Sequence, residues 1–89
     1  MKTEVTTASG FACRLDEEEI LDNYELLELL IRLDSGDRAA LPAVLKLVLG
    51  DEQTAALKEH LRKENGKVAT SAVHLELLEI FRAAKALKN

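Results

Sequence analysis

Leucine is the residue type that most constrains what this chain can fold into. Seventeen of the 89 residues are leucine, and they gather in blocks with helical spacing. Aromatic residues make up only 3% of the chain, so the core must consist of leucine, valine, isoleucine and alanine, which suits helices. A chain of this length buries only about 60 to 68% of the surface that its unfolded form exposes. The leucines therefore exceed what one small domain is expected to bury, which indicates a protein that acts by contact and not by catalysis.

The hydrophobic pattern predicts a mainly α fold, a compact bundle of about four helices preceded by a short β-hairpin at about 3–15. We expect a single domain spanning 1–89. The hairpin is predicted from a period of two, with a turn at Gly10, in Val5, Thr7, Phe11, Cys13 and Leu15. Because isolated hairpins are marginally stable in water, this one should lie against the helices or pair with another chain.

The helices are expected at about 16–34, 42–49, 52–64 and 71–87. The first is predicted to begin at Asp16, which suits an N-cap and is followed by three glutamates at the positive end of the helix dipole. Pro42 argues against one helix through 37–49, because proline disfavours helical geometry at the residue before it. A separate turn could precede it at 38–41. Gly50 and Asp51 favour a junction that ends one helix and caps the next.

The first helix carries two apolar stripes, which is more than one neighbouring element normally covers. One stripe contains Tyr24, Leu27 and Ile31, and the second lies beside it. Our hypothesis is that the second stripe and two valines of the next helix form a self-association or partner-binding surface: Leu26, Leu29, Leu30, Leu33, Val44 and Val48. The alternative, slightly favoured for any one of these residues, is that they belong to the core.

Charge and hydropathy exclude two classes of partner. The formal net charge of -4 has the wrong sign for a protein that neutralises phosphates, so we expect no nucleic-acid partner. The longest apolar run, 39–45, is far shorter than the roughly 20 residues of a membrane span, so we expect no membrane partner. With no secretory signal and one cysteine, the chain is expected in the cytoplasm, a reducing compartment.

Residues with reactive side chains do not form a recognisable site, so no enzyme activity is expected. His60 and His74 fall on different predicted helices without a further ligand at metal spacing, and we expect no metal and no cofactor. His60 is expected to be a partly buried residue of the third helix, and Cys13 a small apolar core residue. The carboxyl pairs, Glu25 with Glu28 and Glu76 with Glu79, are expected on solvated helix surface.

The order and spacing of several segments, together covering about 9–81, resemble the small tail assembly chaperones of long-tailed bacteriophages and prophages. The matching segments are Ser9 to Glu18, Glu25 to Leu30, Leu41-Pro42, Leu49 to Gln53, His60 to Val68, and the region of Glu79 to Phe81. No single segment is specific; their order carries the resemblance.

The resemblance implies a protein without catalytic residues that binds the tape-measure protein, keeps it soluble and helps to recruit tail-tube subunits. Such a chaperone would work in the cytoplasm of the bacterial host and would be absent from the mature virion. In that family a longer form of the same chain often arises by ribosomal frameshifting. Self-association is also expected, because weak contacts repeated along one client add.

The main alternative is a small helical regulatory adapter or inhibitor that binds a basic protein surface. Its binding residues would be the acidic side chains at the start of the first helix: Asp16, Glu17, Glu18, Glu19 and Asp22. Such a contact would depend strongly on salt, whereas a contact dominated by apolar area would tolerate it.

Overall fold

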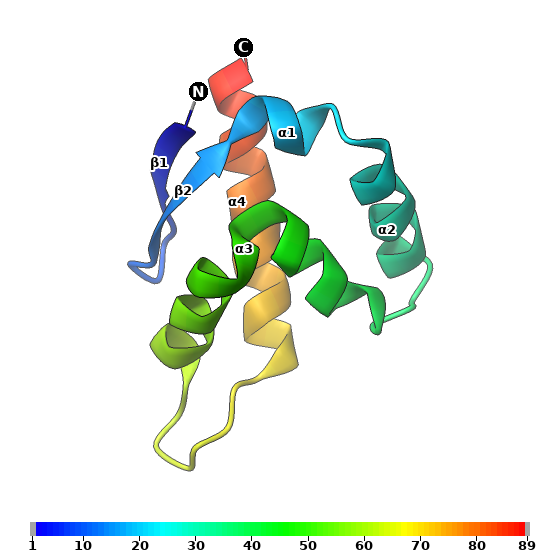
Figure 1. Ribbon diagram of the computed structural model, residues 1–89. Helices are drawn as coiled ribbons and strands as arrows, with labels where there is room; N and C mark the ends of the chain where they lie inside the picture. The colour runs from blue at the N-terminus through cyan, green and yellow to red at the C-terminus, as the bar shows by residue number, and fades with distance from the viewer. Residues whose placement is uncertain (1, 89) are drawn as a thin grey trace.

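The computed structural model describes residues 2–88 and contains a two-stranded hairpin followed by four helices (Figure 1). The elements are β1 (Lys2–Thr6), β2 (Ala12–Asp16), α1 (Glu17–Leu21), α2 (Tyr24–Asp34), α3 (Ala40–Leu61) and α4 (Thr70–Lys88). The long α4 lies at the centre, with the hairpin beside it on one side and α2 on the other (Figure 1). The predicted mainly α class with an N-terminal hairpin is confirmed.

The hairpin forms where the alternating pattern predicts it. Its strands are antiparallel, and Val5 lies opposite Cys13 in the register. Gly10 has a φ of 92°, and it closes the turn by donating its backbone N–H to the carbonyl of Thr7 at 2.9 Å. The inward side chains of the strands, Val5, Cys13 and Leu15, are buried.

The hairpin packs within this chain, against α3 and α4. Gln53 of α3 binds the backbone of β2 twice: its Oε1 accepts from the Arg14 N–H at 2.6 Å, and its Nε2 donates to the Arg14 carbonyl at 2.9 Å. The amide side chain thus satisfies backbone groups that a neighbouring strand would otherwise satisfy.

The single helix predicted at 16–34 is wrong, because the chain breaks into α1 and α2. Asp16 caps α1 as expected, accepting from the Glu19 N–H at 3.3 Å. Asn23 then caps α2, with its side-chain oxygen accepting from the Leu26 N–H at 3.2 Å. Asparagine competes for backbone donors in this way and favours helix starts over helix interiors. The break lets α1 pack on α4 while α2 packs on α3.

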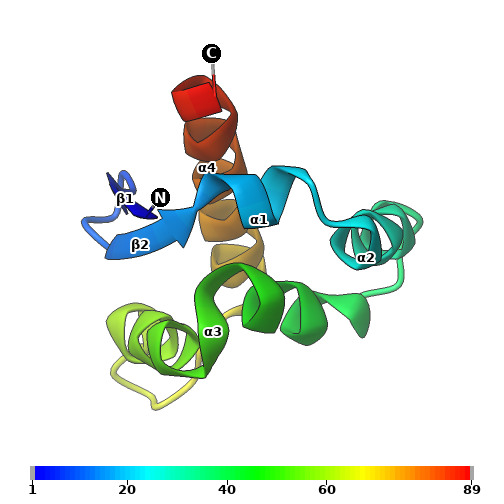
Figure 2. The same ribbon diagram turned by 45° about the horizontal axis from the view of Figure 1, so that its top comes forward.

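The helices predicted at 42–49 and 52–64 are two halves of α3, joined at a kink. Gly50 has φ 77° and ψ 171°, which is not helical, so the predicted junction lies at the expected residue. Figure 2 shows the two halves meeting at an angle. Pro42 lies in the first turn of α3, where a missing N–H leaves no intrahelical bond unmade. The second half ends at Leu61 and not at 64, because Arg62 is extended.

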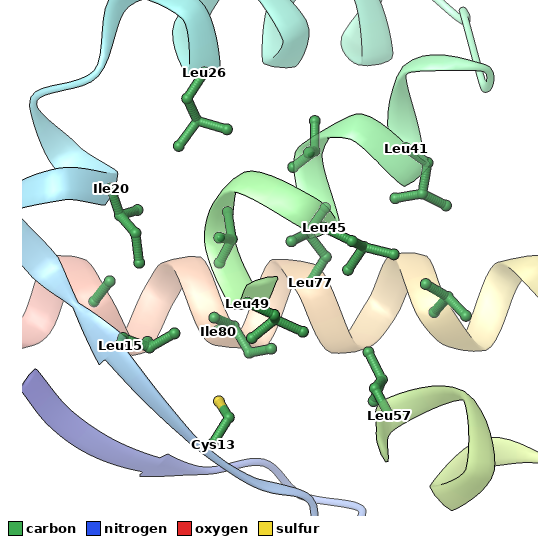
Figure 3. Close-up of a cluster of buried hydrophobic side chains, with 14 of the residues drawn as sticks. Cys13, Leu15, Ile20, Leu26, Leu41, Leu45, Leu49, Leu57, Leu77 and Ile80 are labelled. Carbon is green, nitrogen blue, oxygen red and sulfur yellow. The ribbon is translucent and has the colours of Figure 1, made fainter. Parts of the chain in front are cut away.

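The core lies where α4 meets the hairpin and α3. Leu77 and Ile80 of α4 are fully buried, and Figure 3 shows them between β2 on one side and α3 on the other. Leu57 enters from the second half of α3, and Leu26 enters from α2. The last helix was predicted at 71–87 and spans Thr70–Lys88. None of the helices within the described residues is long and apolar enough to cross a membrane.

Candidate interaction surfaces

The structure places the six predicted partner-binding residues mainly in the interior. Four of them, Leu26, Leu33, Val44 and Val48, are buried in the core, and two, Leu29 and Leu30, are half-buried and packed against it. A partner could reach the buried four only if α2 left α3. Partner binding through them stays a prediction, and their burial favours the alternative that they are core residues.

The exposed stripe of α2 is the one that was not predicted to bind a partner. The side chains of Tyr24, Leu27 and Ile31 are 72%, 51% and 57% exposed. Their spacing of three and four residues aligns them on one side of the helix. The core covers the side of α2 that carries Leu26, Leu29, Leu30 and Leu33, and it leaves this stripe largely open. The sequence indicates an excess of apolar surface, but it does not say which stripe α3 covers.

A second open apolar face belongs to α4. Leu75 is 62% exposed, Leu78 is 43% exposed, and Phe81 is half-buried. These residues lie one turn apart, beside the strip of α4 that enters the core. Of the six large apolar side chains that are exposed in residues 2–86, α2 and α4 together carry five.

The edge of the α2 stripe at Leu27, together with the half-buried Leu30, borders a groove whose other side is the open face of α4. At the α1 end, a hollow of about 400 Å³ is lined by Leu27 and Leu30 from α2 and by Phe81 from α4. At the other end, a hollow of about 450 Å³ is lined by Leu33 from α2 and Leu75 from α4. We call this feature the α2–α4 groove and define it by Leu27, Leu30, Leu75, Leu78 and Phe81. Figure 1 shows how the helices are arranged around it: α2 and α4 stand apart, with α1 near one end of α2 and the start of α3 near the other.

Polar and charged residues are found at both ends of the groove. Asp22 and Lys85 line the hollow at the α1 end, and Arg38 and His74 line the hollow at the opposite end. The other large side chains that line the two hollows, among them Leu27, Leu75 and Phe81, are apolar. A ligand of this groove would therefore be selected mainly by apolar area and shape, with polar contacts at its two ends.

A further hollow of about 600 Å³ lies inside the bend of α3, next to the start of α4, and shares Arg38, Leu41 and Thr70 with the neighbouring hollow of the groove. Its apolar lining consists of Leu41, Pro42, Leu45, Val68 and Val73, with Arg38 and Lys58 also among its lining residues. No carboxyl group of a described residue lines it. We call it the Arg38–Lys58 hollow. It exists because the kink at Gly50 folds one half of α3 toward the other, close enough for the Thr54 hydroxyl to donate to the Leu45 carbonyl at 3.3 Å.

The turn of the hairpin is held on α4 by two glutamates. The Glu76 Oε1 accepts from the Thr7 hydroxyl at 2.7 Å and from the Ser9 hydroxyl at 3.0 Å. The Glu79 Oε1 accepts from the Ala8 N–H at 2.9 Å. Glu76 is only 4% exposed, so its predicted place on solvated helix surface is wrong. A buried carboxyl group needs hydrogen-bond donors, and the hairpin turn supplies them.

Glu25 and Glu28, the other carboxyl pair, are exposed, as predicted. The two pairs differ because the hairpin covers α4 at Glu76, whereas this side of α2 faces solvent.

His60 completes this contact from α3, but the group does not have the order of a hydrolytic triad. The His60 Nε2 lies 3.1 Å from the Ser9 hydroxyl and 3.0 Å from the Ser9 carbonyl, and its ring lies 5.7 Å from that of Phe11. In a triad the acid orients the histidine. Here Glu76 accepts from the serine instead, so the contacts support a structural role. His60 is exposed, which corrects the prediction that it is partly buried.

Cys13 lies in the core, as predicted, at 3% exposure. Burial raises the pKa of its thiol above the ordinary value of 9.0, and the nearby Glu76 raises this pKa further. A raised pKa keeps the sulfur protonated at neutral pH, which opposes nucleophilic chemistry.

Within residues 2–88, no three histidine, cysteine, aspartate or glutamate side chains are placed to hold a metal ion. No family model, no curated protein and no solved structure matches this chain.

Proposed function

We propose that this chain is a tail assembly chaperone that holds an amphipathic helix of the tape-measure protein in the α2–α4 groove. The observation that carries the proposal is the groove itself, an open channel with apolar side chains on both walls. The order of the sequence segments that resemble tail assembly chaperones supports the choice of client. The chain would shield apolar stretches of the tape-measure protein and keep it soluble until tail-tube subunits arrive.

The dimensions of the groove suit a helix. Its α2 wall is 11 residues long, which corresponds to about 16 Å or three helical turns. A client helix with apolar residues at intervals of three and four positions could bring one stripe to the groove and leave its polar face in water. Leu30 and Phe81, both half-buried, would contact the deepest side chains of that stripe.

A single groove of this size would bind its client helix weakly. Binding of many copies along one client compensates for the low affinity of each groove. The tape-measure protein is long, so many copies of the chaperone could bind along it, and linked weak contacts reach a high combined affinity. Weak individual contacts would also allow the chaperone to leave as the tube forms. Host cytoplasm, absence from the virion and a longer frameshifted form belong to the same proposal.

A co-expression experiment tests the proposal, with Leu78→Glu as the test variant. Leu78 is 43% exposed, so the charged side chain should leave the fold intact while placing a carboxylate on the groove wall. We expect wild-type protein to keep the tape-measure protein of the same phage soluble and to co-purify with it. The variant should lose at least about tenfold in affinity, as expected for one charged group set in an apolar contact.

Leu47→Glu is the matched control. Leu47 is 47% exposed on α3, outside the groove, so this variant should retain the client like the wild type. Equal loss by both variants, or retention by both with unchanged circular dichroism, would contradict binding in the groove.

The adapter alternative has one observation in its favour, since Glu18 and Glu19 are exposed in the first turn of α1. Other carboxyl groups of that segment have roles within the chain. Asp16 caps α1, and Glu17 accepts from the Thr3 hydroxyl at 3.2 Å. Salt distinguishes the two functions: complexes of the groove should persist at high salt, whereas complexes through Glu18 and Glu19 should dissociate.

A further inference from the structure

We propose that copies of this chain associate head to tail, with the outer face of α2 of one copy seated in the Arg38–Lys58 hollow of the next. This inference deepens the proposed function, because it names the contact through which copies would align along a client. The outer face of α2 consists of Tyr24, Glu28 and Ile31, with Leu27 at its edge; Tyr24 and Leu27 also line the hollow at the α1 end of the α2–α4 groove.

The outer face of α2 combines apolar anchors with a carboxylate. Tyr24, Glu28 and Ile31 follow each other at intervals of four and three residues, so Glu28 lies between the two apolar side chains. All three are exposed. Arg32, one turn after Glu28, already contacts Asp37 at 2.8 Å. Glu28 makes no ion pair with another described residue, so its charge is free to pair with a partner.

The Arg38–Lys58 hollow has the complementary composition. Its apolar lining can receive the tyrosine and isoleucine side chains, and its two cations would face the carboxylate between them. Neither Arg38 nor Lys58 forms a salt bridge with another described residue. Arg62 is the main cause of the lowered pKa of the Glu59 carboxyl group, and the nearby Lys58 lowers this pKa slightly further. Opposite charges beside matched apolar surface give a contact both orientation and register.

The composition of the Arg38–Lys58 hollow indicates that the outer face of α2 from a second copy binds there. A segment that fits this hollow needs apolar anchors and a nearby carboxylate, and the outer face of α2 has both on one exposed helix. The two patches lie on different elements, so the contact is not self-complementary. Repetition of such a contact yields a ring or an open filament, not a closed dimer.

The contact is small, and we expect it to be weak. A few anchoring side chains bury less than the roughly 800 Å² per partner of a standard interface. Association should therefore appear at micromolar or higher protein concentration and grow with concentration.

Exchange of the charges tests the contact directly. One variant carries Glu28→Lys, and the other carries Arg38→Glu with Lys58→Glu; all three positions are exposed, and circular dichroism checks that both variants fold. Light scattering on a sizing column should show that the wild type associates and that each variant alone is monomeric, because like charges then meet. A mixture of the two variants should associate again, because each outer face then finds a hollow of opposite charge.

Two further variants separate this contact from others. Lys46→Glu changes a charge on α3 outside the hollow and should associate like the wild type. Leu78→Glu should also associate normally while losing the client, so a failure of the groove and a failure of this contact are distinguishable. A wild type that stays monomeric at every concentration, or a mixture that stays monomeric, would overturn the proposal. Association of the single variants at the wild-type level would overturn it as well.

Discussion

At the scale of single residues, position in the fold decides between chemically equal side chains. Glu28 and Glu76 both lie on helices with a second glutamate three residues away, yet one is solvated and the other is buried beneath the hairpin turn. Sequence spacing cannot distinguish them, because the donors of Glu76 come from Thr7 and Ser9, almost 70 positions earlier in the chain. The buried carboxyl group therefore reports a tertiary contact that local periodicity does not contain.

Glu76→Ala should lower the free energy of unfolding by about 1 to 3 kcal/mol, because two hydroxyl donors lose their acceptor and a small cavity opens. Urea unfolding measures the loss. Glu25→Ala, at an exposed position on α2, is the control and should change stability by less than about 0.5 kcal/mol. Equal stability of the two variants would show that the hairpin turn does not depend on Glu76.

At the scale of elements, two single residues determine where the helices are interrupted. Asn23 separates α1 from α2, and Gly50 divides α3 into two halves. The acidic start at Asp16 and the junction at Gly50 are predictable, because capping side chains and a glycine with positive φ have strong local signatures. The sequence pattern does not predict the break at Asn23, because the apolar periodicity continues across this residue. Asparagine ends up as a cap there because α1 and α2 pack on different partners, a requirement that only the assembled fold imposes.

Gly50→Ala should destabilise the protein by about 1 to 3 kcal/mol, because the backbone conformation at this kink is one that only glycine adopts readily. The loss would come from the backbone alone, since an added Cβ meets no atom within 4 Å. Ala43→Gly, an exposed change in the first half of α3, is the control and should cost only the helix propensity of about 1 kcal/mol. Thermal unfolding of both variants compares them, and an unchanged stability in Gly50→Ala would show that the kink is not required.

At the scale of the whole molecule, the excess of leucine predicts an interaction surface but not its location. The radius of gyration, 12.6 Å, is close to the roughly 12 Å expected of a compact chain of this length, so the groove does not arise from a loosely folded chain. It arises because α3 covers the side of α2 at Leu26 and Leu33 and leaves Leu27 exposed and Leu30 half-buried. Which of two adjacent stripes becomes core depends on the angle at which α2 meets α3, and helical periodicity does not encode that angle.

A methyl NMR titration tests whether the α2–α4 groove binds an amphipathic helix. Leucine methyl groups of this protein would be observed while a helical peptide from the tape-measure protein is added. We predict saturable shifts at Leu27, Leu30 and Leu78, with Leu47 unchanged as the internal control. Shifts centred on Leu47, or no shifts at millimolar peptide, would contradict binding of the helix in the α2–α4 groove.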